Sequence, residues 1–241
     1  MTTVSVPAKF NGPPASGNGG YSCGVLAKRF DGPAAVSLKR HIPLDRAVEL
    51  RFEDDGAMRA FSDGETIAEA VAATPLAPWD GPTIDLDAAR AAHDRFAPAG
   101  SGTFDTCFVC GRARPDGLHV FSGPTNFDGV VASHWTPPDW AADEDGAVLP
   151  EFVWAVLDCP GYFALHGGDL AVAYLVRQQV EIVTPPRVGV EYVVAGRALE
   201  RSGRKGLAAT AILDAEGEVL AHAECLLVAP RQAVDPTGVG E

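Results

Sequence analysis

The stretch "LPEFVWAVLDCPGYFAL", Leu149 to Leu165, decides how the second half of the chain folds. Its apolar residues fall on all sides of a helix, a pattern typical of a buried helix rather than a surface one. Pro160-Gly161 is expected to kink or interrupt that helix. Three long strand candidates follow at residues 170–183, 190–203 and 205–229. A buried helix followed by a run of strands predicts an α+β fold, in which a curved antiparallel sheet wraps around the helix.

The first half of the chain shows a similar order of shorter segments. Apolar and polar residues alternate at 36–39 and 48–51, which favours half-buried strands. Asp55-Gly56 and Asp63-Gly64 are typical turn pairs between strands, and the run from Asp214 to Gly217 predicts a hairpin turn in the second half. Each half therefore has a short buried helix, then strands with acidic-glycine turns.

This repetition predicts a duplicated unit of about one hundred residues. We place the first half at residues 1–75 and the second at 106–230. Residues 76–105 are rich in turn formers and are predicted to link the halves, with one short helix capped by Asp85 or Asp87. Residues 231–241 are predicted to form a mobile tail.

Composition narrows the classes of function. The 241 residues carry a formal charge of −13, which disfavours nucleic acid and anionic membrane surfaces as partners. Five cysteines, an odd number, argue against a disulfide framework. The sequence has neither a run of eighteen apolar residues nor the basic-then-apolar start of a signal peptide, so a cytoplasmic protein without membrane spans is expected.

A second stretch, "SGNGGYSCGVLA" at Ser16 to Ala27, places two glycines directly before a small apolar run that favours a helix. Glycine weakens a helix by about 1 kcal/mol, so Gly19-Gly20 indicates either an ordinary loop-to-helix turn or a helix start left bare for a ligand. Asn18 fits the helix N-cap.

Three segments are informative together: "CFVCGRARPDGLHV" at 107–120, the strand run from Pro185 to Val228, and "NGGYSCGVLAKRF" at 18–30. Together they resemble the hotdog-fold acyl-CoA thioesterase-like superfamily, and the third is similar to the helix start of double-hotdog acyl-CoA thioesterases. The resemblance implies a tandem hotdog that hydrolyses acyl-CoA-type thioesters. In that family a site forms between two helices: one helix start supplies amides for the thioester oxygen, and a carboxylate on the partner helix acts as base or nucleophile.

The family spacing places the acid nine residues after the first residue of the helix start. In the first half, Asn18 begins the start but Ala27 stands at the acid position. In the second half, Leu149 begins the start and Asp158 stands at the acid position. The resemblance therefore implies one complete site made by Asn18, Gly19, Gly20, Tyr21 and Asp158. The opposite interface would lack both features.

Asp158 also stands out without any family, because burying a carboxylate in an apolar helix is costly. Such groups often act in proton transfer. The alternative is that Asp158 caps a backbone group at the Pro160-Gly161 break. Glu151, at the helix start, has the ordinary structural explanation of an acid that interacts with the helix dipole.

For the ligand, Trp154 and Phe163 are candidates to contact an acyl chain, and Arg204 and Lys205 are candidates to contact coenzyme A phosphates. Both pairs also have a structural explanation: the aromatic residues could belong to the core, and the basic residues could be solvated charges in a turn.

The pair Cys107 and Cys110 lacks the second cysteine pair that zinc sites normally have, even if His119 or His134 contributed. We therefore expect no metal and no cofactor beyond coenzyme A as part of the substrate. Cys159 is interpreted as a buried structural thiol, and His166-Gly167-Gly168 as the end of the helix and a turn.

Two other functions remain open at this point. One is a hotdog protein that binds an acyl thioester or lipid-like ligand without turnover. The other is an enoyl-thioester hydratase, although the Asp-His spacing common in such enzymes is absent. The expected partner is a small acyl thioester, and a homodimer is the expected assembly.

Overall fold

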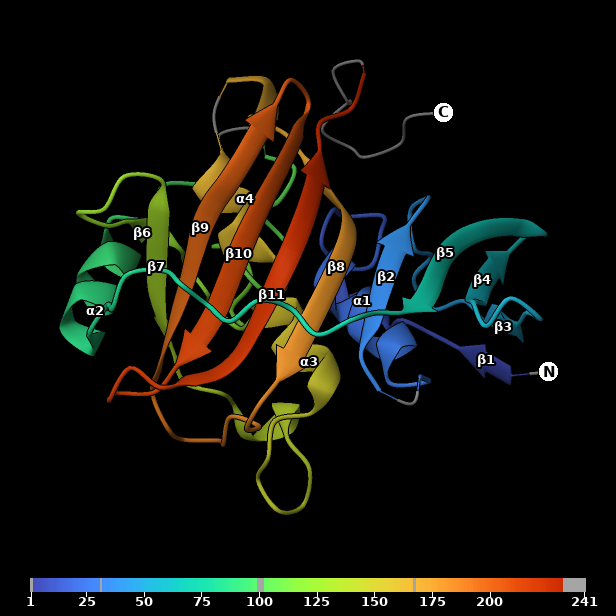
Figure 1. Ribbon diagram of the computed structural model, residues 1–241, viewed down its shortest axis with the longest axis horizontal. Coiled ribbons are helices and arrows are strands. Elements are labelled where there is room, and N and C mark those ends of the chain that lie inside the picture. The colour runs from blue at the N-terminus through green and yellow to red at the C-terminus, as the bar shows by residue number, and fades with distance from the viewer. Residues whose placement is uncertain (1, 31, 99–101, 167, 232–241) are drawn as a thin grey trace.

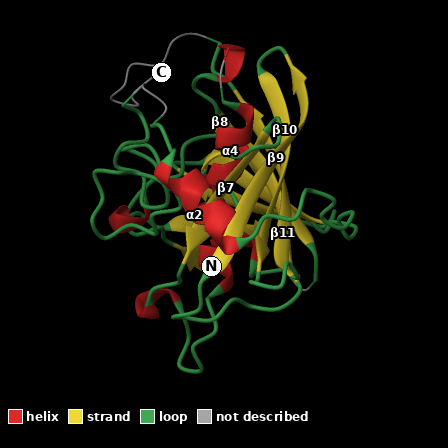
Figure 2. Ribbon diagram, turned by 90° about the vertical axis from the view of Figure 1, so that its left-hand side faces the viewer, coloured by secondary structure: helices red, strands yellow, loops and turns green. Residues whose placement is uncertain are grey.

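The computed structural model describes residues 2–30, 32–98, 102–166 and 168–231, so most of the predicted tail lies outside the described residues. Within these ranges the strands form one antiparallel sheet in the order β1-β3-β4-β5-β2-β8-β11-β10-β9-β7-β6 (Figure 1). Viewed along the sheet, the helices lie mainly to one side of its long strands (Figure 2).

The first five strands in that order come from the beginning of the chain, and the last six come from its second part. Their bounds are β1 Thr2–Val4, β2 Ala34–Leu38, β3 Val48–Phe52, β4 Met58–Ser62, β5 Glu65–Ala72, β6 Gly123–Pro124, β7 Val130–Trp135, β8 Tyr174–Ile182, β9 Tyr192–Ser202, β10 Lys205–Leu213 and β11 Val219–Val228. The helices are α1 Gly19–Ala27, α2 Leu86–Asp94, α3 Pro150–Val156 and α4 Cys159–Leu165, with short 3-10 helices η1 Ala8–Phe10, η2 Asp139–Ala141 and η3 Gly168–Leu170. The predicted antiparallel sheet with buried helices is thus confirmed.

The two groups of strands join at β2 and β8. Ala35, Val36 and Ser37 pair with Gln179, Gln178 and Arg177 across this junction. The pairing is short, but it makes the sheet continuous from one half of the chain to the other. It also brings α1 of the first half against α3 of the second half, behind the sheet (Figure 1).

The predicted turns connect the strands as expected. Gly56 lies between β3 and β4 with φ +79°, and Gly64 lies between β4 and β5 with φ +81°. Gly217, with φ +87°, lies in the turn between β10 and β11. These backbone angles favour glycine, which explains why the acidic-glycine pairs were informative in the sequence.

The buried helix of the second half is interrupted earlier than predicted. α3 ends at Val156 and α4 begins at Cys159, so the break lies at Leu157 and Asp158 rather than at Pro160-Gly161. Pro160 has no N–H to bond back to the carbonyl of Val156, and its ring crowds that carbonyl. The break therefore falls about half a turn before the proline.

Between β5 and α2 the chain crosses the outer face of the sheet (Figure 1). The side chain of Gln179 in β8 donates to the Thr74 carbonyl at 2.6 Å, and Arg197 in β9 pairs with Asp80. Asp85 caps α2 by accepting a hydrogen bond from the Ala88 N–H at 2.8 Å, as predicted. The connecting segment is thereby attached to the second group of strands.

Both central helices are enclosed by the fold. All residues of α1 from Gly20 to Ala27 are buried, as are Glu151 to Val156 in α3. Among the described residues, no helix has both the length and the apolar character needed to cross a membrane.

Candidate active site between α1 and α3

Asp158 lies in the break between α3 and α4 and faces the start of α1. Its Oδ2 accepts a hydrogen bond from the Gly20 N–H at 2.9 Å, across the boundary between the two halves of the chain. The residue is only 7% exposed. Burial raises the pKa of the Asp158 carboxyl to about 7, and the hydrogen bonds from Gly20 and Asn18 oppose that rise. The carboxyl of Asp158 can therefore exchange a proton near neutral pH.

The start of α1 is built by Asn18. Its side-chain Oδ1 accepts a hydrogen bond from the Tyr21 N–H at 2.9 Å, which is the usual N-cap arrangement. The Tyr21 amide is consequently occupied and does not point at a ligand, contrary to the expectation for an oxyanion donor. In the described part of the chain the Gly19 N–H has no hydrogen-bond partner. Gly19 also lines the neighbouring cavity.

Gly20 is required by the close approach of the two helices. A Cβ at this position would lie 2.5 Å from the Trp154 carbonyl oxygen and 2.7 Å from Cβ of Asp158. Gly24, one turn later, is equally close to α3: a Cβ there would lie 2.6 Å from Cα of Glu151. The helix start therefore approaches Asp158 only because α1 carries no side chain on this face.

A cavity of about 390 Å³ opens beside these groups. Its walls come from both halves of the chain and include Asn18, Gly19 and Asp158 together with apolar side chains such as Leu175 and Tyr162. Lys39, Arg40 and His41, which follow β2, also line it. The cavity lining therefore includes a carboxylate, the Gly19 backbone, apolar side chains and basic side chains.

Four predicted ligand contacts do not line this cavity. The Trp154 carbonyl accepts a hydrogen bond from the buried Gln178 side chain, and Phe163 packs against Phe96 at a ring separation of 4.9 Å. Arg204 donates to the Ala229 carbonyl, and Lys205 begins β10. The basic residues beside the cavity are those of the run Lys39-Arg40-His41, which sequence reasoning treated only as the end of a strand.

Among the described residues, the opposite end of the helix pair carries an ion pair rather than a second site. Lys28, just after Ala27, forms an ion pair with Glu151 at 2.7 Å. The Glu151 side chain is 8% exposed and that of Lys28 is 39% exposed. An ion pair between α1 and α3 thus stands where a second acid and a second bare helix start would be expected.

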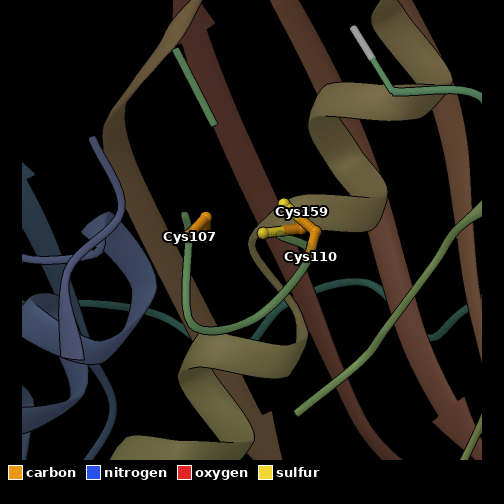
Figure 3. A group of neighbouring side chains, drawn as sticks. All are labelled: Cys107, Cys110 and Cys159. Atoms are coloured by element: carbon orange, nitrogen blue, oxygen red, sulfur yellow. The ribbon is translucent and has the colours of Figure 1, made fainter. Parts of the chain in front are cut away.

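Three cysteines form a cluster next to Asp158. The sulfur atoms of Cys107, Cys110 and Cys159 all lie within 4.8 Å of one another, and all three residues are buried (Figure 3). Hydrogen bonds from the Cys110 and Cys159 thiols hold the pKa of Cys107 well below its usual value. Cys159 is thus not an isolated structural thiol. The only signals in the sequence are the Cys-x-x-Cys pair and the position of Cys159 directly after Asp158.

Comparisons with solved structures identify the fold. No family model matches the chain, and no curated protein matches its sequence. Among solved structures, a TesB protein of Mycobacterium avium subspecies paratuberculosis matches 95% of this chain and 92% of its own length, with 16% identity and a TM-score of 0.57. A candidate thioesterase II from Thermobifida fusca gives the same coverage and TM-score at 15% identity.

A third structure names the fold. It is a conserved protein of unknown function with a hot dog fold from Alicyclobacillus acidocaldarius, which matches 96% of this chain and 93% of its own length. The identity is 12% and the TM-score 0.54. These similarities extend over almost the whole chain. The chain therefore has a hot dog fold.

Proposed function

We propose that this protein hydrolyses acyl-CoA-type thioesters at the interface between two tandem hot dog units. The observation that carries the proposal is the hydrogen bond of 2.9 Å between the Gly20 N–H and Asp158 Oδ2. It brings a helix start from one unit and a buried carboxylate from the other to the edge of one cavity. The thioesterase-like structural neighbours support the same reaction class.

In the proposed reaction Asp158 acts as a general base. It takes a proton from water, whose oxygen bonds to the thioester carbonyl carbon. The negative charge that develops on the carbonyl oxygen is stabilised at the start of α1, where Gly19 offers an N–H and the helix dipole favours an anion. The Gly20 and Tyr21 amides are already bonded to Asp158 and Asn18. The carbon–sulfur bond then breaks, and Asp158 returns the proton to the thiolate. In a variant of this scheme the carboxylate attacks the carbonyl carbon itself, and water hydrolyses the resulting anhydride.

The cavity walls suggest how the substrate would lie. The apolar side chains of Tyr162 and Leu175 suit an acyl chain, whereas Lys39 and Arg40 suit phosphates of coenzyme A. Lys39 and Arg40 have exposed side-chain fractions of 47% and 57%, and each already pairs with a glutamate, Glu69 and Glu65 respectively. A phosphate would compete with these glutamates.

The test is a panel of acyl-CoA thioesters with detection of the released thiol, applied to the wild type and to Asp158→Asn. Asp158→Asn should lower kcat by at least about 100-fold, the lower limit for loss of a general base. Glu200→Gln, which neutralises an exposed carboxylate of β9, is the matched control and should leave the rate unchanged. Hydrolysis at the wild-type rate by Asp158→Asn, with every substrate of the panel, would contradict the assignment.

The same panel separates hydrolysis from binding alone. Thermal stabilisation by an acyl-CoA without thiol release would favour a binding protein over an enzyme. Comparison of an acyl-CoA with the corresponding N-acetylcysteamine thioester measures the contribution of the nucleotide part. If Lys39 and Arg40 contact phosphates, the CoA thioester should have the lower KM.

A further inference from the structure

The three-cysteine cluster has features that the thioester chemistry does not require. Cys107 and Cys110 come from a loop that lies outside both central helices, and Cys159 is the first residue of α4 (Figure 3). Cys23 and Cys225, which are also buried, do not belong to the cluster. The three thiols come from two distant parts of the chain, so the tertiary fold brings them together.

The loop that carries Cys107 and Cys110 makes a tight turn. The Gly111 N–H donates to the Cys107 carbonyl at 2.8 Å, and a Cβ on Gly111 would lie 2.5 Å from that carbonyl oxygen. Asn18 Nδ2 lies 3.8 Å from the Cys107 sulfur. An N–H donor beside a sulfur is the kind of outer-shell contact that orients and tunes a metal-bound thiolate.

The spacing of the sulfur atoms matches a tetrahedral metal ion. Zinc binds thiolate sulfur at about 2.3 Å, so two sulfurs of one tetrahedral site lie about 3.8 Å apart. The cluster, with all sulfurs within 4.8 Å, needs only small side-chain movements to reach that geometry. Zinc sites often take two ligands from a Cys-x2-Cys pair and further ligands from distant residues. Here the fold supplies Cys159 as a third ligand, which the sequence alone did not suggest.

The surroundings allow a charged site to form. Three thiolates and one divalent cation carry a net charge of −1, and the Arg114 guanidinium interacts electrostatically with Cys107. All three cysteines line the cavity beside α1, which provides a path for the ion and an open fourth position. Asp158 lines the same cavity and is adjacent to Cys159 in the chain.

We propose that Cys107, Cys110 and Cys159 bind one zinc ion as thiolates, with the fourth coordination position open to the cavity. The site stands independently of the proposed hydrolysis, because metal content and ligand type are measured without any substrate. A protein that binds zinc but hydrolyses no thioester would support this inference and contradict the function proposed above.

The experiment uses the full chain, reduced, freed of metal by a chelator and then loaded with Zn²⁺ or Co²⁺. After gel filtration we expect one metal ion per chain, and for Co²⁺ the intense near-ultraviolet charge-transfer absorption of cobalt–thiolate bonds. A small thiol added to the Co²⁺ protein should shift that spectrum, since it can occupy the fourth position. Each of Cys107→Ser, Cys110→Ser and Cys159→Ser should weaken binding by more than about 100-fold, because loss of outer-shell groups alone costs 10- to 100-fold.

Cys23→Ser and Cys225→Ser are the matched controls, since both remove a buried thiol outside the cluster. They should keep one metal ion per chain. If a cluster variant does not fold, the stoichiometry and cobalt spectrum of the wild type still decide the question. Substoichiometric metal, a cobalt spectrum without thiolate bands, or a Cys107–Cys110 disulfide in place of metal in freshly isolated protein would overturn the proposal.

Discussion

At the scale of single residues, the contact between Gly20 and Asp158 depends on two properties: Gly20 has no side chain, and Asp158 is bonded to a backbone amide rather than to a cation. Gly20 has no Cβ, so the backbone of α1 reaches the Trp154 carbonyl of α3. Asp158 has no cation as partner in the described contacts and is held by the amide of Gly20 instead. A neutral or an ionised carboxyl can both occupy this position, which suits a group that gains and loses a proton.

We predict that Gly20→Ala destabilises the fold. In an open helix this change would stabilise the protein by about 1 kcal/mol, because alanine is the better helix former. Here the added Cβ would lie 2.5 Å from a backbone oxygen, which cannot move as a flexible side chain can. The net loss should be about 1–3 kcal/mol in the free energy of unfolding, measured with urea.

Ser22→Ala in the same helix is the control for that measurement. The Ser22 hydroxyl is buried and has no hydrogen-bond partner among the residues that the structure describes. Its removal should leave stability unchanged or raise it by a few tenths of a kcal/mol. Equal losses in Gly20→Ala and Ser22→Ala would show that the helix contact is not the cause.

At the scale of elements, α1 and α3 are held together at one end by the ion pair of Lys28 and Glu151. Because the Glu151 side chain is almost fully buried, removal of Lys28 leaves a carboxylate with little access to water. We predict a coupling of about 1–2 kcal/mol in a double-mutant cycle with Lys28→Met and Glu151→Gln, measured by urea unfolding.

The exposed pair of Arg46 and Asp63 is the reference for this cycle. Its side chains are 58% and 69% exposed. A pair of this kind typically contributes about 0.2–1 kcal/mol. A coupling for Lys28 and Glu151 as small as that of the reference pair would mean that the ion pair does not hold the two helices together.

Some site residues could not be identified from the sequence, because it does not show which face of a buried helix meets the cavity. Alternation and turn pairs predicted the strands, because each half-buried strand has one polar face. The stretch at 149–165, which forms α3 and α4, is apolar on all sides, so nothing in the sequence tells which side meets the cavity. Trp154 and Phe163 therefore looked equally suited to the core and to a ligand, whereas the structure packs both away from the cavity.

At the scale of the whole molecule, the resemblance to double-hotdog thioesterases was the most informative property of the sequence. The helix-start spacing that it implies, applied to both halves, paired Asn18, Gly19 and Gly20 of one half with Asp158 of the other, and these residues do lie together. The cysteine cluster could not be predicted in this way. Its third member is 49 residues away from Cys110 and belongs to a helix, so only the tertiary fold brings the sulfurs together.

The attachment of α2 to the sheet predicts a loss of stability in acid. His93 in α2 lies 2.9 Å from the Ser133 hydroxyl of β7, and burial, then the neighbouring His134, lower its pKa below the ordinary 6.5. Its other charged neighbours are Asp94, His119 and Arg112. Between the folded and unfolded pKa values the unfolded chain binds more protons, so stability falls as the pH drops below about 6.5.

Urea unfolding between pH 5 and pH 8 tests this prediction, with His93→Gln as the comparison. Glutamine retains a hydrogen-bonding group but does not titrate. The variant should lose less stability than the wild type between pH 7 and pH 5. Parallel curves for the two proteins would assign the acid sensitivity to other groups.

The backbone contact between α1 and α3 also limits how the cavity can change. At Gly20 and Gly24 the two helices already touch without intervening side chains, so their separation is at its minimum. Thermal motion and an entering molecule can widen this gap but cannot narrow it. The resting protein therefore holds the Gly20 amide and Asp158 at their shortest separation. A molecule that enters between the helices has to move them apart, and the pairing of β2 with β8 opposes that movement.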